Sequence, residues 1–171
     1  FLITGVAGEF LAGLRNEYVG EPFRIPAASM LPTLQIGDHF YSDSRAYADH
    51  GPSRGDIIIF TVARDGSAIY PADRRPALPT ENFVKRVVGV PGDEIRLHGA
   101  TLIVNGVAVT GPPFDERYEA PTGRSLIQRP EELDSHHYRV LDDPNLERDA
   151  VIVNVEPGRY FVSGDNRLHS N

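Results

Sequence analysis

The chain has 171 residues, of which 40% are hydrophobic, so it is long and apolar enough to bury a core as one globular unit, with room for a subdomain. Its formal charge is -7 and its cationic residues are scattered rather than clustered, which argues against a nucleic-acid partner. The absence of cysteine excludes disulfides, thiolate metal sites and a cysteine nucleophile.

The first predicted element lies at the N-terminus. Apolar residues recur at helical spacing from Phe1 to Leu14, whereas Glu9 and Arg15 lie off that stripe. We expect a helix that packs on the core, and the alternative is that residues 1–20 form a membrane-proximal segment. No run approaches the roughly 20 apolar residues that are needed to span a bilayer.

The middle of the chain has the pattern of strands separated by turns. Segments rich in β-branched and aromatic residues are bounded by Gly, Pro, Asp or Asn, which is typical of short strands. In chain order they are His39 to Ser42, Asp56 to Val62, Asn82 to Val90, Glu94 to Leu97, Thr101 to Val104, Val151 to Val155 and Arg159 to Ser163. The Asn-Gly pair within Val104 to Val107 predicts a tight hairpin. The predicted fold class is mainly β, with antiparallel sheets.

Two stretches interrupt this pattern and are predicted as long surface loops, Ala63 to Thr80 and Gly111 to Pro144. Loops of this length are unusual in a compact domain, so we expect the second to belong to a small inserted subdomain. It contains His136 and His137, but adjacent side chains of an extended chain point to opposite faces and no third ligand accompanies them. We predict a solvated loop pair and no metal site.

Two serines are candidates for a nucleophile. Gly51 to Gly55 matches the pattern Gly-x-Ser-x-Gly, but a strand follows it where that motif requires a helix, so Ser53 is predicted to be a turn residue. Ser29 lies on a turn framed by prolines, between small and apolar residues, where its hydroxyl could be exposed beside an apolar groove. Taken alone, Ser29 also fits a serine that only bonds its local backbone.

Lys85 is the one lysine of the sequence, and it lies inside an apolar predicted strand. Arginine stays protonated in proteins, whereas a desolvated lysine loses its proton readily, so a site that needs a neutral amine as base must use lysine. Alternation places Lys85 on the same strand face as Phe83 and Val87, which would lower its pKa. A lysine that protects an edge strand, or a compositional bias toward arginine, would also explain the residue.

Four segments, in this order along the chain, resemble the bacterial type I signal peptidases, which are membrane-anchored Ser-Lys endopeptidases. These segments are Ser29 to Leu34 followed by Gly37-Asp38, then Arg54 to Ile57, then Lys85 to Gly89 with Pro91 to Asp93, and finally Gly164 to Arg167 with Ser170. Each segment alone is a weak signal, and the last would by itself be a structural turn. Their common order is what makes the resemblance specific.

The resemblance implies a role for each matching residue. Ser29 would be the nucleophile and Lys85 the general base that takes its proton and later activates water. Ser170 would orient the Lys85 amine, and Asp165 would pair with either Arg86 or Arg167. Shallow apolar pockets for small residues before the cut would be formed by Phe23, Ile25, Met30, Leu34, Phe83 and Val84. No cofactor and no metal are implied.

The resemblance also implies a domain organisation and a setting. Residues 1–96 and 156–171 would form a catalytic β domain, and residues 97–155 a smaller inserted β subdomain. Exported preproteins would bind as extended strands and be cut after Ala-x-Ala motifs. The catalytic face would lie on the extracytoplasmic, periplasmic side of the cytoplasmic membrane, with the anchor outside these residues.

One position departs from the family pattern. Many members place a serine two positions before the nucleophile, where its hydroxyl helps to bind the oxyanion, and this chain has Ala27 there. Loss of one oxyanion donor can lower a rate about 10²- to 10³-fold. Three alternatives stay open: a conjugative pilin-processing Ser-Lys peptidase, a non-catalytic peptide-binding β module, and a self-cleaving repressor domain. The last is disfavoured by the acidic charge and the lack of a DNA-binding module.

Overall fold

The computed structural model describes residues 20–43, 45–61, 82–112, 116–121, 123–143, 145–146 and 149–167. The predicted N-terminal helix and the predicted loop Ala63 to Thr80 lie outside these residues. The described chain is built of short strands with one 3₁₀ turn, and every strand pair in it is antiparallel. The prediction of a mainly β fold with antiparallel sheets is therefore confirmed. In this part of the chain no helix is long and apolar enough to cross a membrane.

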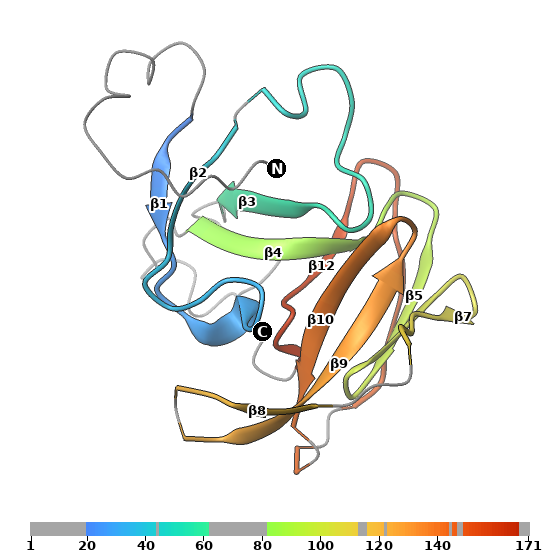
Figure 1. The fold of residues 1–171 in the computed structure, drawn as a ribbon. Coiled ribbons are helices and arrows are strands. Elements are labelled where there is room, and N and C mark those ends of the chain that lie inside the picture. Colours follow the sequence, from blue (N-terminus) through green and yellow to red (C-terminus); the bar gives the residue numbers. More distant parts are fainter. Residues whose placement is uncertain are drawn as a thin grey trace, which may run out of the picture.

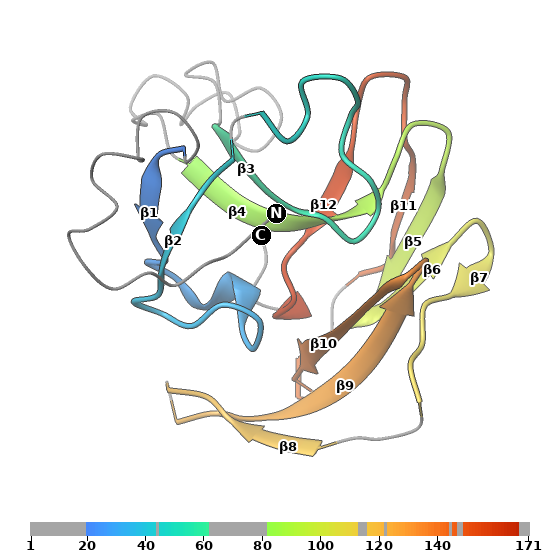
Figure 2. The same cartoon turned by 45° about the horizontal axis from the view of Figure 1, so that its top comes forward.

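Two of the sheets lie on one side of the molecule (Figure 2). A two-stranded sheet pairs β1 with β2, and a three-stranded sheet has the order β12-β4-β3. The strand bounds are β1 Pro22–Arg24, β2 His39–Tyr41, β3 Ile57–Thr61, β4 Asn82–Gly89 and β12 Phe161–Ser163. Between β1 and β2 the chain forms the 3₁₀ turn η2 (Ala28–Met30).

The other two sheets of the described chain lie on the opposite side (Figure 1). One has the order β11-β5-β6-β7 and the other the order β10-β9-β8. Their bounds are β5 Glu94–His98, β6 Thr101–Val104, β7 Val107–Ala108, β8 Glu116–Glu119, β9 Ser125–Leu133, β10 His136–Asp142 and β11 Val151–Asn154.

The predicted hairpin joins β6 to β7. Val104 pairs with Val107, and the two residues between them have positive φ, 52° at Asn105 and 80° at Gly106. Positive φ at both central positions is the backbone requirement of a type I′ turn, which Asn-Gly satisfies at low cost. The hairpin prediction is confirmed.

The prediction that Gly111 to Pro144 is a surface loop is wrong. Most of this stretch forms β8, β9 and β10, and His136 and His137 open β10 rather than lying in a loop. Its polar composition concealed the strands because polar groups such as Gln128 and Glu131 are themselves buried. Whether residues 97–155 form a separate inserted subdomain stays a prediction.

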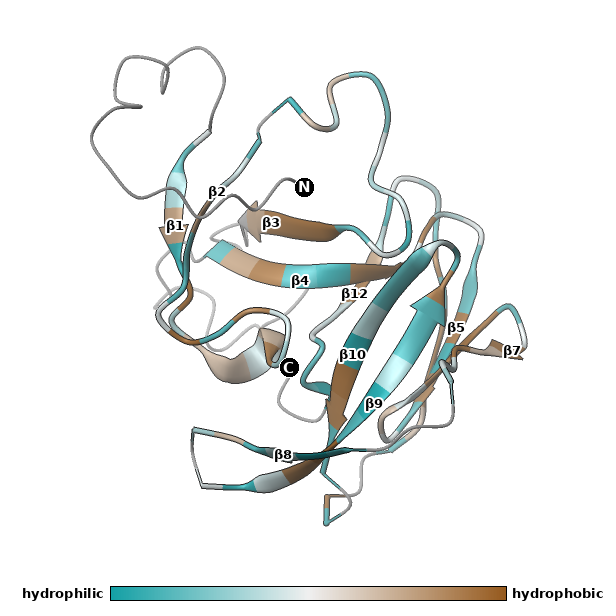
Figure 3. Ribbon diagram, viewed as in Figure 1, coloured by the Kyte–Doolittle hydropathy of each residue, from teal (hydrophilic) through white to brown (hydrophobic). Residues whose placement is uncertain are grey.

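The apolar side chains gather in three buried clusters. One joins the sheets around β5, β6 and β10, with Ile95, Leu102 and Val140 at 1% exposure or less. The second lies under β1, β2 and β3, and the third packs Leu31 against the β8–β9 hairpin. Apart from its start, β4 is apolar with one hydrophilic band in the middle (Figure 3). That band, Lys85-Arg86, lies next to the second cluster.

Candidate active site

Ser29 lies in η2, half-buried, on a loop that distant residues hold in place. The backbone N–H of Asn166 donates to the carbonyl oxygen of Ser29 at 3.1 Å, and Nδ2 of Asn166 donates to the carbonyl oxygen of Ala28 at 3.1 Å. The two following side chains, Met30 and Leu31, are buried in different apolar clusters. The position of the Ser29 backbone is therefore fixed on both sides.

Lys85 is buried, with 5% of its surface exposed, near the middle of β4. It pairs with Ile58 of β3 on one side, whereas β12 pairs with β4 only from Arg86 onward. Burial lowers the pKa of the Lys85 amine below its usual range, and the carboxylate of Asp165 acts in the opposite direction. The amine is thus easier to deprotonate than one in water.

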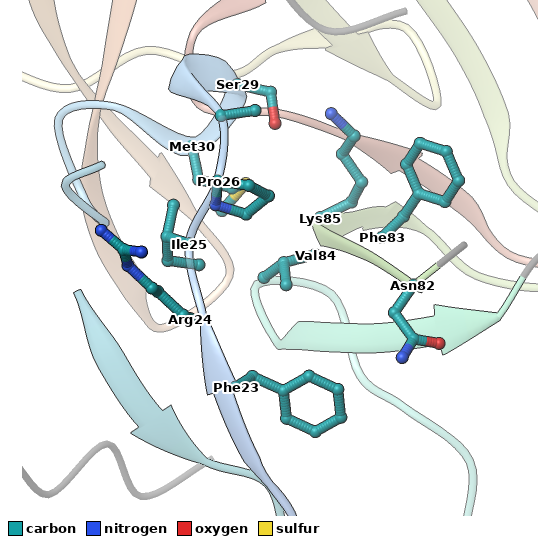
Figure 4. A pocket seen from close by; sticks show the side chains of 11 residues that line it. Phe23, Arg24, Ile25, Pro26, Ser29, Met30, Asn82, Phe83, Val84 and Lys85 are labelled. Carbon is teal, nitrogen blue, oxygen red and sulfur yellow. The ribbon is translucent and has the colours of Figure 1, made fainter. Parts of the chain in front are cut away.

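Ser29 and Lys85 line the same pocket, which has a volume of about 360 Å³. Figure 4 shows the hydroxyl of Ser29 and the amine of Lys85 directed toward each other at one end of it. A hydroxyl and a lysine amine of lowered pKa in one pocket are the parts that a nucleophile and its general base require.

Five of the six residues that were predicted to bind substrate line this pocket: Phe23, Ile25, Met30, Phe83 and Val84. The sixth, Leu34, is 4% exposed and packs in the core cluster with Met30 and Phe40, so it is not part of the pocket wall. Ala27 is exposed and lines the pocket next to Ser29. The wall is mostly apolar, with Lys85 as its buried charged group.

Behind the pocket lies a buried ion pair. Two side-chain nitrogens of Arg86, Nε and Nη2, donate to the carboxylate of Asp165 at 2.8 and 2.7 Å. Arg86 also donates to the carbonyl oxygen of Gly55 at 2.6 Å, and its guanidinium lies 3.9 Å from the ring centre of Tyr138. Asp165 accepts a further bond from the hydroxyl of Thr33. Of the two arginines expected as partners of Asp165, Arg86 is the one that pairs with it in the structure.

Arg167 instead pairs with Glu131 of β9, which is not among the residues predicted from the sequence. Arg167 is 1% exposed and Glu131 is 5% exposed. Burial raises the pKa of the Glu131 carboxyl, and the charge of Arg167 opposes that shift. Glu131 was missed because its segment was predicted as a loop. The available signal was in the paired strand β10, where Tyr138 and Val140 alternate with polar residues.

Two other predicted positions have different outcomes. Ser170 lies outside the described residues, so its hydrogen bond to Lys85 stays a prediction. Ser53 is a turn residue, as predicted: its carbonyl oxygen accepts from the N–H of Asp56 at 3.2 Å, and its own N–H donates to the Asp56 carboxylate at 2.9 Å.

Comparison of the sequence with known proteins finds a matching family and several similar proteins. The sequence model of a family described as "Signal peptidase, peptidase S26" matches residues 2–171. Over 95% of the chain, the sequence is 31% identical to "Signal peptidase I" of Pseudomonas aeruginosa, and over 98% it is 33% identical to "Probable signal peptidase I-2" of Synechocystis. Over 90% of the chain it is 33% identical to "Signal peptidase I" of Bacillus caldolyticus. The chain spans 57%, 60% and 68% of the length of these relatives.

Proposed function

The chain belongs to the peptidase S26 family of signal peptidases, and on this premise we propose that it is the catalytic part of a serine endopeptidase that removes signal peptides from exported preproteins. The observation that carries the proposal is the pairing of the Ser29 hydroxyl with a buried lysine amine across one apolar pocket (Figure 4). A non-catalytic peptide-binding module would have no use for a desolvated amine beside a serine, because burying a lysine costs stability.

In the proposed reaction, Oγ of Ser29 attacks the carbonyl carbon of the scissile bond while the neutral amine of Lys85 takes the hydroxyl proton. The tetrahedral intermediate then breaks its C–N bond, and the proton passes from Lys85 to the leaving amine. The acyl group stays on Ser29. Lys85 next takes a proton from water, which attacks the ester, and Oγ of Ser29 leaves with that proton.

The substrate is proposed to bind as an extended strand between β1 and the first half of β4. On one side of Phe83, Val84 and Lys85 lies β3, and among the described residues no strand pairs with them on the other side. β1 likewise pairs with β2 on one side only in this part of the chain. These strand edges offer main-chain partners, and the apolar pocket between them suits the small side chains of an Ala-x-Ala motif.

Membership of the signal peptidase family also supports a setting. We place the catalytic face on the extracytoplasmic side of the cytoplasmic membrane, where signal peptides emerge.

The test is cleavage of a synthetic signal peptide that contains Ala-x-Ala before the cut. Ser29→Ala and Lys85→Arg should each lower turnover about 10³-fold or more, because one removes the nucleophile and the other replaces the base by a group that stays protonated. Ser53→Ala is the matched control, since Ser53 is an exposed turn serine, and it should cleave like the unmodified chain. Near-normal turnover by Lys85→Arg would refute the neutral-amine mechanism.

A further inference from the structure

A second pocket, of about 290 Å³, lies on the other side of η2. Ala27 and Ser29 line both pockets, so the candidate nucleophile stands in the wall between them. The floor of the second pocket is apolar, with Leu31 and Leu126 both buried. The β8–β9 turn, which lies beside η2 in both ribbon views, forms its far side (Figures 1 and 2).

Arg124 is the charged residue among the described residues that line this pocket. Its side chain is 52% exposed and reaches Asp143 at 3.5 Å, a long contact, and that carboxylate also accepts from the backbone N–H of Asn145. The Arg124 backbone is held because its carbonyl oxygen accepts from the N–H of Ala120 at 2.8 Å. The pocket therefore combines an apolar floor with a half-exposed guanidinium that is paired with Asp143.

We propose that this second pocket receives the first residues after the scissile bond, and that Arg124 makes it favour acidic side chains at the second and third of them. The inference rests on the proposed function, because it assumes that the scissile bond lies at Ser29. A substrate that pairs with the edges of β1 and β4 and is cut at Ser29 must continue past η2. The second pocket lies on that path.

The direction of the bound substrate follows from the residues that surround each of the two pockets. The first pocket is flanked by unpaired strand edges, which suit several extended residues, and it contains Lys85. The second is bounded by a turn and by Asn166, so it offers side-chain contacts rather than a strand partner. The residues before the cut, which stay attached to Ser29 in the acyl-enzyme, belong in the first pocket, and those that leave belong in the second.

The test uses three peptides that are identical up to the cut and carry Glu-Glu, Gln-Gln or Lys-Lys at the second and third positions after it. For the unmodified chain we expect kcat/KM to fall about two- to fivefold from the Glu to the Gln peptide, and by a similar factor from the Gln to the Lys peptide. Changes of this size correspond to the interaction energy of exposed ion pairs. High salt should shrink the difference. Arg124→Gln should remove the preference and Arg124→Glu should reverse it.

Arg96→Glu is the matched control, because Arg96 is also 52% exposed and paired with an acidic residue but lies on β5, and it should keep the original order. Equal rates for all three peptides would overturn the inference. A second peptide set, which carries Glu, Gln or Lys only at the middle residue of Ala-x-Ala, checks the position: an Arg124→Glu variant whose charge preference changes in that set instead would also overturn the inference.

A binding measurement separates this inference from the proposed function. The dissociation constants of the three peptides are measured on Ser29→Ala, with and without Arg124→Glu. If the unmodified chain cuts none of the peptides but the Arg124-dependent order of binding holds, the proposed function fails and the charge-selective pocket stands. If peptides are cut but neither rate nor binding depends on Arg124, the pocket assignment fails alone.

Discussion

Asn166 and Ser29 are joined by a hydrogen bond of 3.1 Å from the backbone N–H of the first to the carbonyl oxygen of the second. The side chain of Asn166 holds the neighbouring carbonyl of Ala28 in the same way. The C-terminal segment therefore fixes the backbone of the candidate nucleophile, and Asn166 is a positioning residue for Ser29.

Replacement of Asn166 by Asp tests this positioning role. Aspartate has the same shape, but its side chain cannot donate to the Ala28 carbonyl, and the two oxygens would repel each other. We expect kcat to fall about tenfold or more with little change in KM, because loss of such a bond to a polar group costs about 1–3 kcal/mol. Unchanged kcat at unchanged KM would show that the backbone bond alone suffices.

The pH dependence of cleavage should report the Lys85 amine. Because burial lowers the pKa of Lys85 and the neutral amine is the active form, kcat/KM should fall as the pH falls through that pKa. The midpoint of this limb should lie below 10.5, the ordinary value for lysine. A rate profile measured with a peptide that has no titratable side chains checks this, and a midpoint at or above 10.5 would contradict it.

The same burial predicts that Lys85 lowers stability. The unfolded chain binds the lysine proton more tightly than the folded chain, so the penalty is fully present below the folded pKa and disappears as the pH rises toward 10.5. Lys85→Met should therefore abolish cleavage yet raise the free energy of unfolding at neutral pH by roughly 0.5–2 kcal/mol. Urea unfolding at several pH values checks it. A variant less stable than the unmodified chain at neutral pH would refute the prediction.

The buried pair of Arg86 and Asp165 should respond strongly to loss of one partner. Asp165→Asn leaves the Arg86 guanidinium buried without its counter-charge, and such changes typically cost about 3–5 kcal/mol. The exposed pair of Arg159 and Glu156 gives the control, since Arg159→Gln should change stability by about 0–1 kcal/mol. Thermal or urea unfolding compares the two, and equal effects would mean that burial of the Arg86 pair does not matter.

The local signals in the sequence were sufficient for much of the fold. The Asn105-Gly106 turn was predictable because its backbone geometry depends on those two residues alone. β4 was predictable because its apolar run is interrupted only by Lys85 and Arg86. The strands β8 to β10 were not, because their buried positions include polar groups whose partners come from distant parts of the chain.

The candidate site shows the same division. Ser29 and Lys85 could be selected from the sequence by residue type and by motif order. The partner of Asp165 could not, because Arg86 and Arg167 are chemically alike, and only the folded chain places Arg86 at the Gly55 carbonyl and Arg167 at the Glu131 carboxylate. Leu34 was assigned to the pocket wall because its motif position does not reveal that its side chain points into the core.

The last prediction concerns Ala27, which is exposed beside Ser29 and has no hydroxyl to help bind an oxyanion. Ala27→Ser adds a hydroxyl two positions before Ser29, where the resemblance described above implies an oxyanion donor, without removing any buried group. We expect cleavage of an Ala-x-Ala peptide to stay unchanged or to rise, up to the roughly 10²- to 10³-fold that one oxyanion donor can supply. Steady-state kcat measures this, with Ala28→Ser as the control at a half-buried neighbour. A large loss of turnover in Ala27→Ser alone would mean that the backbone there cannot accept the side chain, and that the oxyanion is bound elsewhere.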